Sequence, residues 1–103
     1  MKQIVVTPSL LEEIEQLSAV NYSYSQMALY LNLPKKLFIQ EAKKKDSDIW
    51  DAIQRGALEA DFNIQSKLLE NAKSGNITAA QIYEKNKAQK ETENLKARIF
   101  YGE

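Results

Sequence analysis

Residues 28–45, "ALYLNLPKKLFIQEAKKK", contain the local features from which the rest of the fold is predicted. This stretch has the pattern of two short helices joined by a tight turn. Asn32 can adopt the left-handed conformation that ends a helix sharply. Pro34 stands where the next helix should begin, a position at which proline is tolerated because its missing N–H would have no partner there. Five lysines follow, so the stretch is either a nucleic-acid-binding element or only a basic corner on a small helical protein.

The composition limits what the chain can be. Its 103 residues suit one domain, and only three glycines and two prolines leave little material for long loops, which favours helices. The absence of cysteine and histidine excludes disulfides, thiolate or imidazole metal sites and nucleophile–histidine catalysis. We therefore expect no enzyme, no metal and no cofactor. The start, "MKQIVVTP", is too short in its apolar run for a signal peptide, and no stretch could span a bilayer. We expect a soluble, cytoplasmic protein.

The charge is neutral overall but unevenly distributed. The chain holds 14 basic and 14 acidic residues, yet residues 34–45 contain five lysines and one glutamate, a net charge of +4. The flanking regions are correspondingly acidic. A neutral total therefore does not exclude a nucleic-acid partner, because binding depends on where the positive charge lies.

Capping residues and apolar spacing predict five helices. The first covers residues 7–19, capped by Thr7 with Pro8 at its first position, or by Ser9 and Glu12 one register later. The second covers 24–31 with Ser23 or Ser25 as its cap, and the third begins at Pro34. The predicted inner faces of these three helices, from the first to the third, are Leu10, Ile14 and Leu17; Met27, Ala28 and Leu31; and Leu37, Phe38 and Ala42.

Two longer helices complete the chain. The fourth covers roughly residues 48–73, capped by Asp46 or Ser47, and carries two apolar stripes, which indicates more than one neighbour. Gly56 inside it is explained by a close helix contact or by simple tolerance. Gly75 ends this helix and Asn76 caps the next. The fifth helix has an inner face of Ile77, Ala79, Ala80, Ile82 and Tyr83. Beyond Tyr83 the chain is polar, but its residues favour a helix.

The predicted fold is all-α. An N-terminal helix-turn-helix of three short helices is followed by a long antiparallel helical hairpin, because a joint of four residues turns the chain back. We divide the chain into a helix-turn-helix region over 1–46, a hairpin for core and oligomerisation over 47–86, and a polar tail or helix extension over 87–103.

A helix-turn-helix makes specific demands, and residues 24–42 meet them in order. Ala28 is the small residue where two helices cross closely, Asn32 forms the turn, Leu33 is the apolar residue after it, and Leu37 and Phe38 pack the second helix down. That helix then exposes residue types that contact phosphates and base edges: Lys35, Lys36, Ile39, Gln40 and Lys43. A helix in the major groove needs basic groups on the flanking phosphates.

Three stretches together resemble the small terminase subunits of tailed bacteriophages, in their short homeodomain-like helix-turn-helix group. They are "MALYLNLPKKLF", "DSDIWDAIQRGALEAD" and "SGNITAAQIYEKN", and they cover roughly residues 24–86 in the order that the family uses. The last is the most distinctive. The chain departs from the family at Asn32, where a glycine is usual, and at Pro34, where Ser or Thr is usual. The Arg-rich end that often follows is absent.

The resemblance implies a non-enzymatic subunit that binds viral double-stranded DNA at the packaging start, in the bacterial host cytoplasm. DNA contacts would fall on Lys35, Lys36, Ile39, Gln40, Lys43 and Lys44. Contacts of a homo-oligomeric ring would fall on Leu58, Phe62 and Leu69. The C-terminal segment would recruit the large ATPase and nuclease subunit, and "IFYGE" is either this docking peptide or a frayed end.

Alternatives stand beside these interpretations. The chain could be a dimeric helix-turn-helix transcriptional regulator of phage or mobile-element origin, or a helical interaction module whose lysines are merely solvated. Leu58, Phe62 and Leu69 could cover the first helix instead of another subunit. We expect Trp50 in the core and Tyr30 packed with its hydroxyl in water. Capping and dipole interactions explain Asp46, Asp48 and Asp51 better than a metal does.

Overall fold

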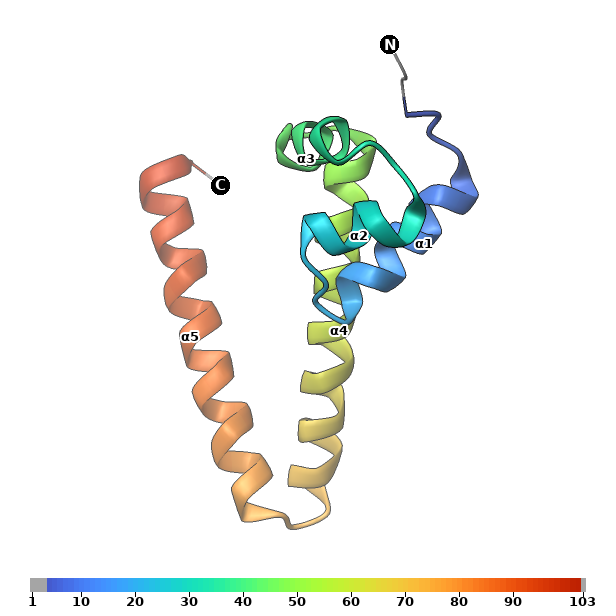
Figure 1. Ribbon diagram of the computed structural model, residues 1–103. Coiled ribbons are helices and arrows are strands. Elements are labelled where there is room, and N and C mark those ends of the chain that lie inside the picture. The colour runs from blue at the N-terminus through green and yellow to red at the C-terminus, as the bar shows by residue number, and fades with distance from the viewer. Residues whose placement is uncertain (1–3, 103) are drawn as a thin grey trace. The chain divides into compact units, whose positions relative to one another are not determined.

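The computed structural model describes residues 4–102, and within this range the chain forms five α-helices and no strand (Figure 1). The helices are α1 (Pro8–Ala19), α2 (Tyr24–Leu31), α3 (Lys35–Lys43), α4 (Asp48–Lys73) and α5 (Ile77–Tyr101). The all-α prediction is confirmed. The chain divides into two compact units, Met1–Phe62 and Asn63–Glu103, with the division inside α4.

The predicted caps occur at most helix ends. The Thr7 hydroxyl accepts a hydrogen bond from the Leu10 N–H at 3.1 Å, with Pro8 in the first turn of α1. Ser23 and Gln26 form a reciprocal capping box at α2. These side chains satisfy N–H groups that have no partner within the helix. Of the alternative caps predicted for the first two helices, Thr7 is the one that caps α1 and Ser23 is the one that caps α2.

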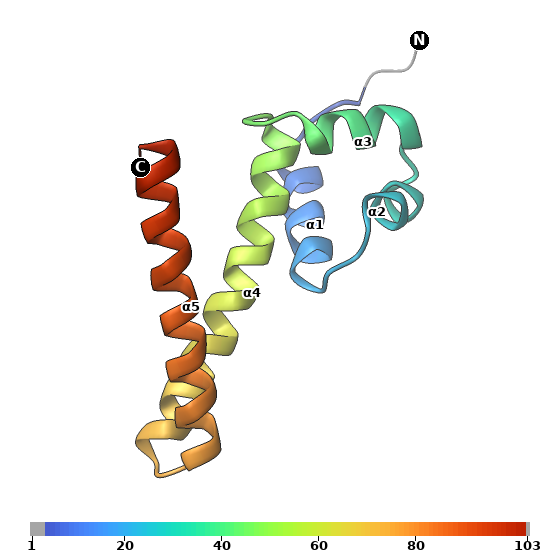
Figure 2. The same cartoon turned by 90° about the vertical axis from the view of Figure 1, so that its left-hand side faces the viewer.

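The first unit has a single apolar core. Figures 1 and 2 show α1, α2 and α3 gathered around the N-terminal half of α4. The core contains residues from all four helices: Ile14, Leu17, Met27, Ala28, Phe38, Ala42, Ile49, Ala52 and Ile53. Of the predicted inner faces of the first three helices, Leu10 and Leu31 pack against this core and the other residues belong to it, except Leu37, which is half-buried outside it. Phe38, the central aromatic residue of α3, is fully buried, which fixes which side of α3 faces solvent.

A close contact joins α1 to α4. A Cβ atom on Gly56 would run into the Glu15 carbonyl oxygen and would lie 3.0 Å from the Ser18 Cβ. One turn earlier on α4, the buried Ser18 hydroxyl donates a hydrogen bond to the Ile53 carbonyl at 2.6 Å. Gly56 is thus present because the two helix backbones approach each other there, and the alternative of simple tolerance is wrong.

Ser47 connects α3 to α4. Its hydroxyl accepts from the Trp50 N–H at 3.0 Å and donates to the Glu41 carbonyl at 2.7 Å. Asp48 and Asp51 lie in the first turn of α4, where the helix dipole favours carboxylates. Asp46, the other candidate cap, instead has a positive φ of 69° in the joint.

The second unit contains the end of α4 and the whole of α5. Gly75 has φ 99°, and the Asn76 side chain accepts from the Ala79 N–H at 3.0 Å. Ala79 is buried and Tyr83 half-buried, and Asn86 donates to the Gln65 side chain at 3.4 Å. The polar segment after Tyr83 continues as helix to Tyr101. The side chains of Phe100 and Tyr101, with Glu103, lie outside the described residues, so the "IFYGE" prediction stands as it was.

Two predictions for α5 are wrong. Ile77 and Ile82 were placed on its inner face, but both are exposed. A helix with one neighbour buries a single stripe, and the buried and half-buried positions among the described side chains of α5 are 79, 80, 83, 86 and 97. Over residues 4–102, none of the helices combines the length and hydrophobicity needed to cross a membrane.

Candidate nucleic-acid interface

The turn between α2 and α3 is built as the sequence predicts. Asn32 ends α2 in the left-handed conformation, with φ 56° and ψ 45°. The Leu33 N–H then donates to the Ala28 carbonyl at 2.9 Å, which closes the turn over the last residues of α2. Ala28 and the half-buried Leu33 both belong to the packed interior. The direction in which α3 leaves the turn is therefore fixed by backbone hydrogen bonds and by burial together.

The start of α3 is less firmly held than its predecessor's end. Pro34 is the N-cap residue and not the first residue of the helix, so α3 begins one position later than predicted. Pro34 makes no side-chain capping hydrogen bond. Its carbonyl accepts from the Phe38 N–H at 2.9 Å. Since Pro34 offers no capping oxygen, burial of Phe38 and Ala42 is what anchors the helix.

The buried side of α3 leaves a basic side exposed. Lys36, Gln40 and Lys43 recur at spacings of four and three, so they share one helical face, and all three are exposed. Of the other predicted DNA contacts, Lys35 and Lys44 are exposed and Ile39 is half-buried. Within the described residues, none of these lysines forms an ion pair with a carboxylate. All six predicted residues therefore lie on or beside one accessible surface.

The predicted oligomer contacts do not share one environment. Leu58 and Phe62, one turn apart on α4, are 68% and 69% exposed. Leu69 is half-buried and belongs to the second unit. The alternative in which Leu58 and Phe62 cover the first helix is wrong, because side chains covering α1 would be buried. Both remain available to a partner.

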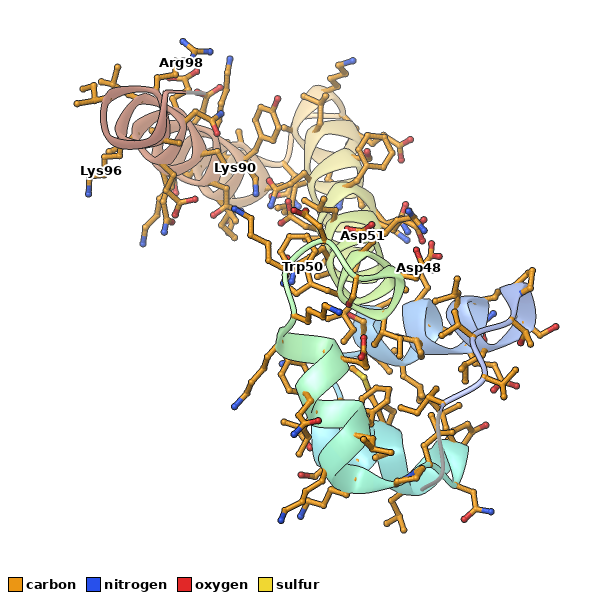
Figure 3. The ribbon with its side chains drawn as sticks, turned by 90° about the horizontal axis from the view of Figure 1, so that it is seen from above. Asp48, Trp50, Asp51, Lys90, Lys96 and Arg98 are labelled. Carbon is orange, nitrogen blue, oxygen red and sulfur yellow. The ribbon has the colours of Figure 1, made fainter. Side chains whose placement is uncertain are left out.

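The start of α4 carries carboxylates that could be mistaken for a site. Asp48 and Asp51 lie on one side of its first turns and Trp50 on another (Figure 3). Trp50 was predicted to lie in the core, but it is half-buried and belongs neither to the core nor to the residues packed against it. Over residues 4–102, no three acidic side chains come close enough together to hold a metal ion. A favourable interaction with the helix dipole is sufficient to explain the positions of the two aspartates.

Sequence reasoning missed an apolar groove where the end of α1 meets α2. It has a volume of about 320 Å³ and is lined by Leu17, Tyr22, Gln26, Leu29 and Tyr30. Tyr30 was expected to pack, but it is 73% exposed, and Leu29 is 83% exposed. A signal was present in the sequence, because residues 16–34 contain no charged side chain.

A small charged cluster on α1 and α4 was also missed. The Arg55 guanidinium lies 3.6 Å from the Glu15 carboxylate. A hydrogen bond with Glu15, followed by partial desolvation and by repulsion from the Glu15 charge, raises the pKa of Glu59, and Arg55 opposes the rise. No sequence spacing brings residue 15 to residue 59, so this contact depended on knowing how α1 packs on α4.

Comparison of the chain with models of protein families, with curated proteins and with solved structures finds no match.

Proposed function

We propose that this protein is a non-enzymatic DNA-binding subunit, similar to a small terminase subunit, that recognises viral DNA for genome packaging. In this proposal residues 24–43 are a helix-turn-helix and α3 is its recognition helix. The following α4 and α5 form an antiparallel hairpin that serves assembly. The oligomer would then present DNA to a large subunit that holds the ATPase and nuclease.

One observation supports DNA binding above the others. Burial of Phe38 and Ala42 turns a face of Lys36, Gln40 and Lys43 to solvent, and these lysines are not neutralised by partners in the described part of the chain. Lysines on the rim of a recognition helix contact phosphates, while the Gln40 amide matches the donor and acceptor pattern of adenine. Lys35 and Lys44 extend the positive charge beyond both helix ends.

Assembly is supported by exposed apolar residues. Leu58 and Phe62 present a pair of large side chains to solvent at helical spacing. Aromatic side chains are enriched at the centres of protein interfaces. A ring would use this pair in a repeated contact between neighbouring subunits.

The test of DNA binding is fluorescence anisotropy with duplex DNA over a salt series. Wild-type affinity should fall steeply with salt, because binding releases counterions from phosphates. The Lys35→Glu plus Lys43→Glu variant should bind much more weakly, and its residual binding should have a salt slope smaller by about 2, one unit for each lost phosphate contact. Circular dichroism should show an unchanged fold.

A matched control makes this test specific. The Lys85→Glu plus Lys87→Glu variant changes the net charge equally, at exposed positions of α5. It should keep most of the wild-type affinity. Equal losses in both variants would mean that only net charge matters, and the proposed recognition surface would be wrong. Light scattering then separates the functions, since a ring supports packaging and a dimer supports the transcriptional regulator.

A further inference from the structure

We infer that the groove where α1 meets α2 is a self-association surface, in which two copies of this chain meet about a two-fold axis. The surface is defined by Leu17, Tyr22, Gln26, Leu29 and Tyr30, and we call it the α2 patch. It shares no residue with the exposed Leu58 and Phe62 pair on α4, and its existence does not depend on DNA binding.

The exposure of the patch is the first step. Leu29 is 83%, Tyr30 73% and Tyr22 48% exposed, although all three are large and mostly apolar. Single exposed apolar residues need no explanation, but neighbours that also border a groove do. Tyrosine is a frequent residue at the centres of interfaces, since it covers a large area and keeps a polar end.

The charge of the patch points to a second copy as its occupant. From Gln16 to Pro34 there is no charged residue, in a chain where 27% of residues are charged. A surface that recognises a different protein commonly uses complementary charge to select it and to speed association. In a two-fold contact the same surface faces itself, so a cluster of one charge would repel its own copy. A neutral surface has no such cost.

The shape of the patch fits a two-fold contact as well. Leu29 is more exposed than Leu17, Tyr22 and Tyr30, and together with Gln26 these residues line a groove of about 320 Å³. A self-complementary surface needs a projection and a hollow side by side, so that each copy fills the other's hollow. Leu29 of one copy would enter the groove of the second, and the reverse contact would form at the same time.

The available area suits the centre of a dimer interface. Fully buried tyrosines contribute 150–250 Å² each, so the exposed fractions of Tyr22 and Tyr30 amount to roughly 200–300 Å². A stable interface uses about 800 Å² on each partner. The two tyrosines thus supply about a third, and Leu29, Val20 and the polar residues around them are available for the remainder. The gain is useful to a chain this small, whose core is limited.

The patch carries no charged group that would bind phosphates. It has no lysine or arginine, and the next basic side chain along the sequence is Lys35. Contact with DNA therefore does not compete for these residues. Loss of this self-association is expected to leave the charge of α3 unchanged, so the two proposals can fail independently.

Light scattering on the full chain tests the inference with two matched variants. Leu29→Glu plus Tyr30→Glu places charge in the α2 patch, whereas Leu58→Glu plus Phe62→Glu makes the same kind of change on α4. The first variant should lower the mass at least two-fold, because a two-fold contact joins equal halves. The second should leave the α2 contact intact and tests only the oligomer surface of the proposed function. A first variant with wild-type mass, or a wild-type monomer up to near-millimolar concentration, overturns the inference.

A cross-linking experiment covers the case in which the first variant does not fold. The chain contains no cysteine, so a single introduced thiol reports one contact. Leu29→Cys should form a covalent dimer with a bifunctional thiol-reactive linker, which spans two thiols that are near but not in contact, in proportion to the associated fraction. Glu12→Cys, on the exposed side of α1, should not. Equal cross-linking at both positions would reflect random collision and would contradict the inference.

Discussion

Residues 4–62 bury Phe38, Ile14, Met27 and Ile49 completely, whereas in residues 63–102 Ala79 is the single residue that becomes buried among the described side chains. Both regions are helical throughout most of their length. The first holds its helices by packing, and the second holds them mainly by capping and by residues that favour helix. The same secondary structure thus rests on different sources of stability.

This difference has a consequence for dynamics. Helices without a packed face are only marginally stable in water, and regions with little apolar burial open at low free energy. We therefore expect residues 63–102 to exchange their amide hydrogens faster than the core helices unless a partner covers them. The exposed Ile82, Leu95 and Ile99 are the residues that such a partner would cover.

The largest expected effect concerns packing in the first region, and two of its phenylalanines, one buried and one exposed, test it. Phe38→Ala removes a fully buried ring and should lower the free energy of unfolding by about 3–5 kcal/mol. That is a large part of the stability of a domain of this size. Phe62→Ala, at a position that is 69% exposed, should change it by less than about 0.5 kcal/mol. Urea denaturation measures both, and similar losses would mean that Phe62 is covered in solution.

Gly56→Ala tests whether the close approach of α1 and α4 is required. Alanine favours a helix by about 1 kcal/mol over glycine. The added Cβ meets the Glu15 backbone, which cannot rotate away, so overpacking of about 1–3 kcal/mol should outweigh this gain. We expect a lower Tm in thermal denaturation. Ala57→Gly at the exposed neighbouring position should also lower Tm, but only because glycine has the lower helix propensity. If Gly56→Ala instead raised Tm, α1 and α4 would not approach each other closely at this position.

Two cap mutants sharpen the contrast between the regions. Ser47→Ala removes both the cap of α4 and the bond to the Glu41 carbonyl, and should cost about 1–2 kcal/mol. Asn76→Ala removes only the cap of α5, at about 1 kcal/mol. Hydrogen exchange should show faster opening of the whole core in the first variant. In the Asn76→Ala variant the faster exchange should be confined to residues 74–80. Faster exchange throughout the chain would mean that the two regions do not have independent stabilities.

The sequence predicts the local structure well because local structure has local causes. Four residues lie at the helix ends that their capping and backbone preferences predicted: Thr7, Ser23, Asn32 and Asn76. The buried face of α3 follows from the spacing of its apolar residues. The exposed lysines follow in turn, since they occupy the remaining face.

What the sequence cannot predict depends on contacts between distant segments. The buried Ser18 looks like a surface residue until the Ile53 carbonyl is brought to it. Periodicity leaves Leu29 and Tyr30 off the inner face of α2, but it does not show that they line a groove with the end of α1. The prediction for Ile77 was wrong for the same reason. The sequence of a helix does not determine how many other helices pack against it.

Glu59→Gln tests the smallest effect, at the joint of α1 and α4. The pKa of Glu59 is raised above its usual value of 4.5, chiefly by its hydrogen bond with Glu15. The folded protein therefore keeps this proton to a higher pH than the unfolded chain does, and stability falls as pH rises through the window above 4.5. Glutamine cannot ionise and keeps a hydrogen-bond donor. The variant should have a slightly higher Tm than wild type at neutral pH and an equal one below 4.5. Glu12→Gln also removes one negative charge from an exposed position, and the same response in both variants would assign the effect to net charge.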